Sequence, residues 1–174
     1  INACISLLNQ VVGKTKNRSE RSRLYFILGQ MNEKINQVTL AKQAYQNSMG
    51  QKSNYELTLR ANIAYKSLDQ SIPALEKMLE DPKNEDQKAA IYVAMGKIFM
   101  EQKDLNRAKN AWEKATKNNP NKGELYFQLG TLFANQIKDY TRASAYFDSA
   151  AISLATSHPA YMKAQKLKKD WNQF

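Results

Sequence analysis

The chain has 174 residues, of which 43% are hydrophobic and 24% charged, with 26 Lys and Arg against 16 Asp and Glu and a formal net charge of +10. This balance is ordinary for a folded domain, and no apolar run reaches the roughly 18 residues that a membrane-spanning helix needs. A single cysteine excludes an internal disulfide framework. Six glycines and four prolines are few for a β-sandwich and are typical of helices joined by short turns.

The first segment, residues 1–21, predicts one helix followed by a basic turn. It begins with isoleucine rather than methionine, and we expect the chain to be a piece of a longer protein. The stretch ACISLLNQVV has the spacing of an amphipathic helix, which we interpret as the second helix of a preceding helix pair. Positive charge gathers in KTKNRSERSR (14–23) and again in KAQKLKK (163–169). Such clusters bind anionic partners or form a solvated surface.

Three glycines stand at the same place in a recurring pattern of small and aromatic residues. Each has a tyrosine four positions before it and, further on, an alanine followed four positions later by an aromatic residue. The alanine stands twelve residues after Gly29 and Gly96 but thirteen after Gly130, as one residue inserted near NQIKD would produce. The three sets are Tyr25, Gly29, Ala41 and Tyr45; Tyr92, Gly96, Ala108 and Trp112; and Tyr126, Gly130, Ala143 and Phe147.

The spacing of these glycines predicts repeats of 34 residues, each folded as two antiparallel helices, A and B. Gly130 follows Gly96 by 34 residues, and Gly96 follows Gly29 by 67, close to two such periods. Glycine costs about 1 kcal/mol against alanine inside a helix, so a packing reason is expected. We expect each glycine to lie where helix A presses on the aromatic residue of helix B. The complete repeats are then 22–55, 89–122 and 123–158.

This pattern resembles the tetratricopeptide repeat. The resemblance implies an all-α fold, an α-solenoid whose antiparallel helix pairs stack into a superhelix with the A helices on its concave face. It further implies that fixed offsets from the packing glycine point into a partner-binding groove. The groove residues predicted in this way include Arg23, Phe26, Gln30, Lys34, Leu57, Arg60, Val93, Lys97, Met100, Glu124, Phe127, Thr131 and Asn135.

The second repeat, 56–88, is predicted to be degenerate. Ile63 stands where the packing glycine is expected, and Leu75 and Leu79 take the helix B positions. Ser71 with Pro73 has the pattern of a helix start, because proline is tolerated in a first turn. The stretch EDPKNED is typical of the turn that leaves this repeat.

The last segment, 159–174, predicts a polar helix that covers the end of the array. Tyr161, Leu167 and Trp171 are its apolar residues, and Ser157 or His158 is expected to cap it with Pro159 just inside. Repeat arrays need such a terminal helix, because the last repeat would otherwise expose its apolar face.

The residue inventory gives no sign of catalysis. The chain has one histidine and one cysteine, far apart in sequence, whereas a metal site needs several converging ligands. A nucleophile would need a base within reach, and His158 beside a proline is typical of a turn. Each glycine within a repeat is assigned to packing, so no phosphate-binding loop remains. We therefore predict a protein that is not an enzyme and uses no cofactor or metal.

Three stretches carry a narrower resemblance, to the PorW/SprE family of tetratricopeptide lipoproteins in the type IX secretion and gliding machinery of Bacteroidetes. They are KTKNRSERSRLYFILGQ (14–30), KMLEDPKNEDQKAAIYVAMGKI (77–98) and AYFDSAAISLATSHPAY (145–161). The resemblance weakens around 50–60. It implies a scaffold on the periplasmic face of the outer membrane that links the periplasmic ring to the outer-membrane translocon, with a lipid anchor outside this segment.

Two other functions stay open. A basic helical-repeat protein could bind RNA through 14–23 and 163–169, with affinity that falls steeply with salt. Sequence-specific RNA recognition usually uses aromatic stacking, and here most aromatic residues are assigned to the core, so nucleic acid is the less favoured partner. The other alternative is an adaptor for a different envelope complex, which the repeat pattern does not separate from the secretion scaffold.

Overall fold

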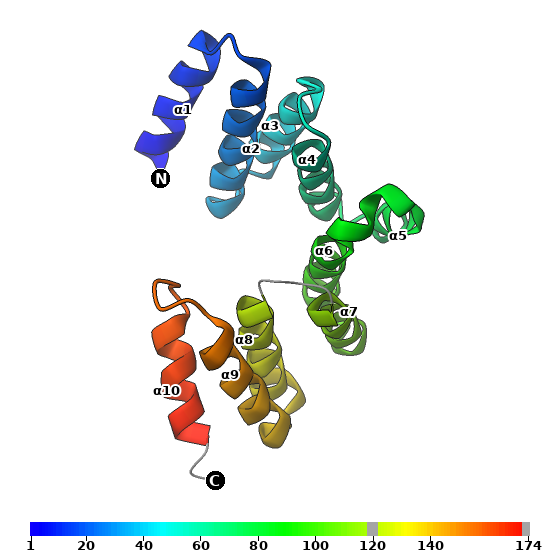
Figure 1. Cartoon of the computed structure of the whole chain (residues 1–174), viewed down its shortest axis with the longest axis vertical. Coiled ribbons are helices and arrows are strands. Elements are labelled where there is room, and N and C mark those ends of the chain that lie inside the picture. Colours follow the sequence, from blue (N-terminus) through cyan, green and yellow to red (C-terminus); the bar gives the residue numbers. More distant parts are fainter. Residues whose placement is uncertain (118–121, 172–174) are drawn as a thin grey trace. The chain divides into compact units, whose positions relative to one another are not determined.

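The computed structural model describes residues 1–117 and 122–171, and its described part is built from helices joined by short turns, without strands (Figure 1). The chain divides into two compact units, Ile1–Glu76 and Lys77–Phe174. Unit 1 contains α1 (Asn2–Lys14), α2 (Arg18–Lys34), α3 (Val38–Gly50) and α4 (Tyr55–Leu68). Helix α5 (Ile72–Glu80) spans the boundary. Unit 2 contains η1 (Pro82–Gln87), α6 (Lys88–Glu101), α7 (Leu105–Lys117), α8 (Lys122–Leu132), η2 (Phe133–Ile137), α9 (Tyr140–Ser153) and α10 (Tyr161–Trp171).

Within unit 1 each helix packs on the next, from α1 to α4 (Figure 1). The core between α2, α3 and α4 holds Ala41, Tyr45 and Ala61, all buried. The helix starts follow from local chemistry, because an asparagine side chain at the N-cap accepts hydrogen bonds from the first free backbone N–H groups. Asn17 accepts from the N–H groups of Ser19 and Glu20 at the start of α2. Asn54 does the same for Leu57 at the start of α4.

Unit 2 contains two extensively packed pairs, α6 with α7 and α8 with α9, followed by α10 against α9. Its larger core joins α7, α8, η2 and α9 through Trp112, Leu129, Phe133 and Phe147, all buried. At the far end of the unit, Ala164 of α10 is buried together with Ala150 and Leu154. Helix α10 therefore covers the end of the last pair, as expected for a capping helix.

The three packing glycines lie directly against the aromatic residue of their own helix B. A Cβ atom added to Gly29 would lie 2.5 Å from Tyr45 Cε1, and one on Gly130 would lie 2.7 Å from Phe147 Cδ1. A Cβ on Gly96 would overlap the indole of Trp112. The glycines thus let the two helices of a pair approach until the ring covers the backbone of helix A.

A second close approach lies seven residues before Gly29 and before Gly130, where helix A begins beside the end of helix B. In the first repeat the buried Ser22 and Ser48 hydroxyls each donate to the other's backbone carbonyl, at 3.0 and 2.9 Å. In the last repeat a Cβ on Gly123 would lie 2.8 Å from the backbone nitrogen of Leu154. Only small residues fit where these two helices cross. A serine is accepted there because its hydroxyl donates a hydrogen bond to a backbone carbonyl of the other helix.

All four A helices end in the same way, with a left-handed residue that is not glycine. Asn36, Gln70 and Lys103 have φ of 59°, 50° and 60° and stand seven residues after Gly29, Ile63 and Gly96. The next N–H reaches back five residues, as in Asp104 N to Phe99 O at 2.8 Å. This bond satisfies a carbonyl that the helix end leaves free. Ile63 therefore occupies the position of the packing glycine in the degenerate repeat.

The fourth repeat differs by one residue, and the extra residue lies within the helix. Lys138, with φ of 64°, stands eight residues after Gly130 rather than seven. Residues Phe133–Ile137 form one π-helical turn, and Asp139 N reaches back six residues to Phe133 O at 3.1 Å. The insertion expected near NQIKD is accommodated as this π-turn, and the left-handed residue that follows helix A in the other repeats is kept.

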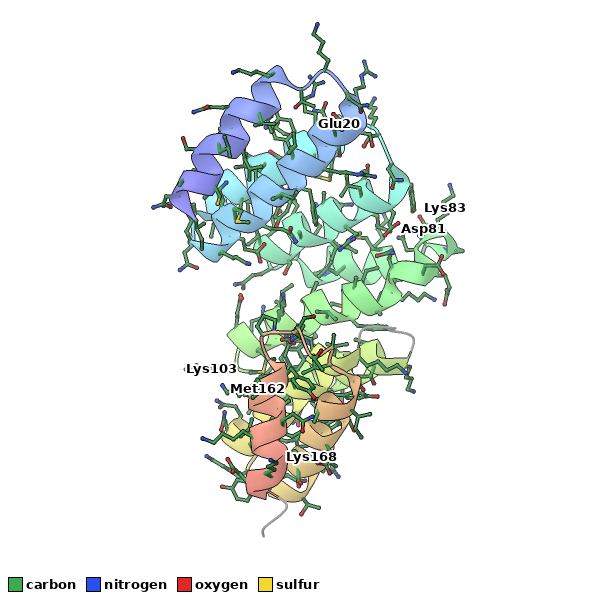
Figure 2. All side chains as sticks on the ribbon, turned by 60° about the vertical axis from the view of Figure 1, so that its left-hand side comes forward. Glu20, Asp81, Lys83, Lys103, Met162 and Lys168 are labelled. Atoms are coloured by element: carbon green, nitrogen blue, oxygen red, sulfur yellow. The ribbon has the colours of Figure 1, made fainter. Side chains whose placement is uncertain are left out.

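We expect that Lys103→Gly stabilises the protein by about 0.5–1 kcal/mol, because glycine adopts a left-handed conformation without the steric cost that lysine pays. Lys103 is exposed, and its side chain points away from the ribbon (Figure 2). Urea unfolding followed by circular dichroism measures the change. The matched control is Lys97→Gly, exposed within α6, which should lower stability by about 1 kcal/mol. Equal effects of the two substitutions would refute this account of the helix end.

The C-terminal helix begins two residues later than expected. Residues 156–160 form a turn, Tyr161 N donates to His158 O at 2.9 Å, and Ala160 N donates to the His158 imidazole Nδ1 at 3.2 Å. Pro159 therefore lies in the turn before the helix, and Ser157 makes no capping bond there. Tyr161 and Leu167 are half-buried as expected, whereas the side chain of Trp171 and residues 172–174 lie outside the described part.

The remaining boundaries move by a few residues. The A helix of the first repeat begins at Arg18, within the segment assigned to the preceding turn, and α5 begins at Ile72, beside the expected Ser71 and Pro73. The EDPKNED stretch forms the 3-10 turn η1. Among residues 1–117 and 122–171, no helix combines the length and the hydrophobicity required to cross a bilayer.

Candidate functional site: the α8 hollow

A hollow of about 260 Å³ opens beside helix α8 in unit 2, and we call it the α8 hollow. Five of the residues predicted for the groove line it, and four of these are Met100 from α6 and Glu124, Phe127 and Thr131 from α8. Asn135, at the next groove offset, lines it as well. The last two repeats thus bring together side chains that are up to 36 residues apart in sequence, from Met100 to Gln136.

The floor of the α8 hollow is apolar. Met100 and Phe127 are half-buried, and the buried residues Trp112 and Leu132 complete the surface. The Phe127 ring packs against Phe147, with 5.9 Å between centroids, so it is held by the core of the last pair. An apolar floor held by core packing is a preformed place for an apolar side chain of a partner.

Three carboxamides line the α8 hollow: the half-buried Gln128 on α8, and the exposed Asn135 and Gln136 on the π-turn, which form its rim. The Gln128 amide nitrogen donates to Glu124 Oε1 at 3.1 Å. Gln128 Oε1 is buried and accepts no hydrogen bond within the described part of the chain. A buried acceptor without a donor is costly, so a rotation of the Gln128 side chain that turns this oxygen toward the hollow would let an N–H or O–H group of a ligand pair with it.

The charges around the α8 hollow differ from those of the chain as a whole. Glu124 is the one charged residue among those that line the described hollow, in a chain of net charge +10. Its Oε2 lies 3.5 Å from His158 Nε2. Lys163 of α10 lies 5.7 Å from the Phe127 ring centroid but does not line the hollow. An anionic ligand would therefore find no cation within the hollow itself.

A second, smaller hollow of about 170 Å³ lies in unit 1 between α2 and α4, and we call it the arginine hollow. The predicted groove residues Arg23, Leu57 and Arg60 line it, with Asn54 and Glu56. The Arg60 guanidinium lies 5.7 Å from the centroid of the Phe26 ring and 3.9 Å from Glu56 Oε1. Because a carboxylate already faces the arginines, the positive charge there is partly compensated.

The other predicted groove residues lie outside both hollows. Gln30, Lys34 and Lys97 are exposed on α2 and α6. Val93 is half-buried and packs on the core of unit 2, and its carbonyl oxygen accepts a hydrogen bond from Trp112 Nε1 at 3.3 Å. Phe26 is half-buried against Tyr45, with ring centroids 5.6 Å apart. Val93 and Phe26 therefore contribute to packing within their units.

The repeat positions predicted to be structural lie in or beside the core. Ala41, Ala108 and Ala143 are fully buried, Tyr45, Trp112 and Phe147 are at most 5% exposed, and Tyr25, Tyr92 and Tyr126 are half-buried. The Tyr45 hydroxyl donates to Glu33 Oε2 at 2.8 Å, and its burial, together with that carboxylate, raises its pKa well above the usual range. Burial and the neighbouring Glu113 raise the pKa of Tyr146 to about 12. These phenols stay protonated at neutral pH and act as donors.

We expect the Asp104 carboxylate to stabilise the protein at neutral pH and to lose this effect in acid. The backbone N–H of Arg107 and then its guanidinium donate to this carboxylate, at 3.0 and 2.6 Å, and hold its pKa below the usual range. A group whose pKa is lowered by folding stabilises above its unfolded pKa of about 4 and loses that contribution as the pH falls further.

Asp104→Asn keeps a capping oxygen but does not titrate. Wild type should therefore melt at a higher temperature than the variant at neutral pH, and the gap should close in acid. A gap that is constant from pH 7 to about pH 2, below the range of carboxyl titration, would contradict the assignment.

Sequence reasoning missed three residues that shape the hollow: Gln128, Leu132 and Gln136. Gln128 and Leu132 fall at offsets that the family pattern does not assign to the groove. Gln136 reaches the rim because the inserted residue turns the end of helix A outward into a π-turn. The signal for it was the thirteen-residue spacing after Gly130.

These packed helix pairs define an all-α protein of the α-solenoid class, ending in a capping helix. Residues 89–122 match the family model of the tetratricopeptide repeat, so this segment is a repeat of that family. Repeats of this family are protein-interaction modules, so the match supports a role in binding other proteins. Within the described residues, no group of three or more His, Cys, Asp or Glu side chains could hold a metal ion.

Two solved structures resemble the chain in fold. One is described as the TPR2AB-domain:pHSP90-complex of yeast Sti1, with 16% identity, 99% of this chain and 79% of that chain covered, and a TM-score of 0.46. The other is the crystal structure of MamA protein, with 15% identity, 87% and 86% covered, and a TM-score of 0.44. No curated protein matches the chain.

Proposed function

We propose that this chain is a non-enzymatic scaffold that binds other proteins through the A-helix surface of its repeats, with the α8 hollow as its main contact. The observation that carries the proposal is the convergence of Met100, Glu124, Phe127 and Thr131 on one apolar hollow with a polar rim. Interfaces draw most of their energy from a few buried apolar and aromatic anchors surrounded by polar groups. Phe127 is such an aromatic anchor, because its ring packs against Phe147 and polar residues surround it in the hollow.

We further propose a place for this scaffold in the type IX secretion machinery, at the periplasmic face of the outer membrane. The support is the resemblance of 14–30, 77–98 and 145–161 to the PorW/SprE family. The partners in this proposal are components of the periplasmic ring and of the outer-membrane translocon.

The test is an affinity pull-down with this chain from a Bacteroidetes envelope extract, with bound proteins identified by mass spectrometry. Phe127→Asp and Phe26→Asp are compared with wild type after thermal melts have established that both variants are folded. We expect ring or translocon components to be recovered by wild type and lost with Phe127→Asp. Recovery that is unchanged in both variants would refute the binding surface. Recovery of nucleic acid or of unrelated proteins alone would refute the secretion role.

A further inference from the structure

The inserted residue of the fourth repeat changes the chemistry of the α8 hollow. Its π-turn, Phe133–Ile137, carries Asn135 and Gln136, and both line the hollow. In the third repeat helix A ends at Glu101 without an extra residue, and Lys103 takes the left-handed position after Gln102. Single π-turns within α-helices occur frequently at functional sites, and here the turn lies at the rim of a hollow that gathers predicted groove residues.

The rim is suited to the backbone of an extended peptide. A carboxamide both donates and accepts, so Asn135 and Gln136 can pair with the alternating C=O and N–H groups of a peptide chain. Gln128 contributes a buried oxygen that accepts no hydrogen bond within the described residues, and its nitrogen already donates to Glu124. One peptide N–H directed at Gln128 Oε1 would satisfy it.

The charges select against an anionic ligand. Glu124 lines the hollow and no lysine or arginine does, although the chain carries ten excess positive charges elsewhere. A terminal carboxylate, a phosphate or an acidic side chain would meet Glu124 without a compensating cation, and like charges repel in such a place. An uncharged internal segment of a partner meets no such penalty.

We propose that the π-turn adapts the α8 hollow to an extended internal segment of a partner protein. The segment inserts one apolar side chain over Met100 and Phe127. Its backbone pairs with the carboxamides of Gln128, Asn135 and Gln136, and one N–H donates to Gln128 Oε1. This inference rests on the proposed function, that of a protein-binding scaffold, and adds the class of peptide and the residues that select it.

The experiment selects ligands for the immobilised chain from two libraries of short random peptides. One library displays the random segment internally, with fixed flanks at both ends, and the other displays it with a free C-terminus. The tightest internal peptide is then synthesised, and its dissociation constant is measured by titration calorimetry. We expect the internal library to enrich an apolar residue at a fixed position, with acidic residues depleted around it.

Three variants separate the inference from the proposed function. Deleting Gln136 restores the twelve-residue spacing between Gly130 and the alanine of helix B, as in the first and third repeats. Gln128→Met keeps the side-chain size but removes the buried acceptor, together with the nitrogen that donates to Glu124. Asn110→Ala, exposed on α7, is the matched control. Leaving a donor of the peptide unpaired should weaken binding about tenfold in Gln128→Met, and we expect a similar loss for the deletion and none for Asn110→Ala.

The outcomes are distinguishable. Peptides that bind equally well to wild type, the deletion variant and Gln128→Met, but lose affinity in Phe127→Asp, would overturn the role of the π-turn and leave the binding hollow in place. Enrichment of free C-termini or acidic residues would overturn the choice of ligand. Failure of both libraries to enrich any binder would overturn the inference and count against the hollow itself. Because Gln128→Met leaves the backbone unchanged, it decides the inference even if the deletion variant does not fold.

Discussion

Replacing Trp112 with alanine lowers the free energy of unfolding by about 3–5 kcal/mol, the range for removing a large aromatic side chain from a packed core. Trp112 is 5% exposed, covers Gly96, and packs with Leu129 and Phe147 in the core of unit 2. Because Gly96 has no side chain that could move into the vacated space, little of the cavity can close. Urea unfolding followed by far-ultraviolet circular dichroism measures the loss.

Trp112→Phe is the matched control for this prediction. It keeps a ring against Gly96, as Phe147 does against Gly130 in the next repeat. It loses the hydrogen bond from the indole nitrogen to Val93 O, which should cost about 1 kcal/mol. If the alanine variant were as stable as the phenylalanine variant, Trp112 would not hold the pair together.

Replacing Gly96 with leucine costs about 1–3 kcal/mol or more, because it overpacks a contact that has no free space. Even a Cβ atom would overlap the Trp112 indole, so Gly96→Ala should also destabilise, although alanine is the better helix former by about 1 kcal/mol. The helices α6 and α7 would have to separate to admit either side chain.

Gly13→Ala is the control for Gly96→Ala. Gly13 is also helical, in α1, but nothing lies within 4 Å of an added Cβ. The substitution should therefore stabilise by about 0.5–1 kcal/mol through helix propensity alone. Opposite signs for the two alanine variants in thermal and urea unfolding are the expected result. A stabilising Gly96→Ala would contradict the close approach of α6 and α7.

The helix pairs were predictable because their contacts are local and repeated. One glycine and one aromatic residue, a fixed number of residues apart, determine where the two helices touch, and this spacing can be read directly from the sequence. The α-solenoid class followed from it. The capping helix was also predictable. A mostly polar helix with a few apolar residues, placed after the last repeat, is expected to cover the apolar end of the array. Its start at Tyr161 was not predictable, because His158 bonds with the turn before the helix.

The hollow was harder to predict from sequence. Offsets from a glycine place a side chain on one face of helix A, but a hollow also depends on how the neighbouring repeat approaches. Met100 and Phe127 share a hollow, whereas Lys34 and Lys97 at comparable positions lie exposed. The thirteen-residue spacing after Gly130 signalled an insertion, but a turn and a π-helix satisfy that spacing equally. Only the geometry shows that the insertion carries Gln136 to the rim.

The central claim is that the α8 hollow binds a protein segment, and its most direct test is one titration. The dissociation constant of the selected internal peptide is compared between wild type and folded Phe127→Asp, with Asn110→Ala as the control. Loss of the apolar anchor and burial of a charge predict at least about tenfold weaker binding in Phe127→Asp, with Asn110→Ala equal to wild type. Equal affinity in all three proteins would contradict the claim, because the peptide would then bind elsewhere on the chain.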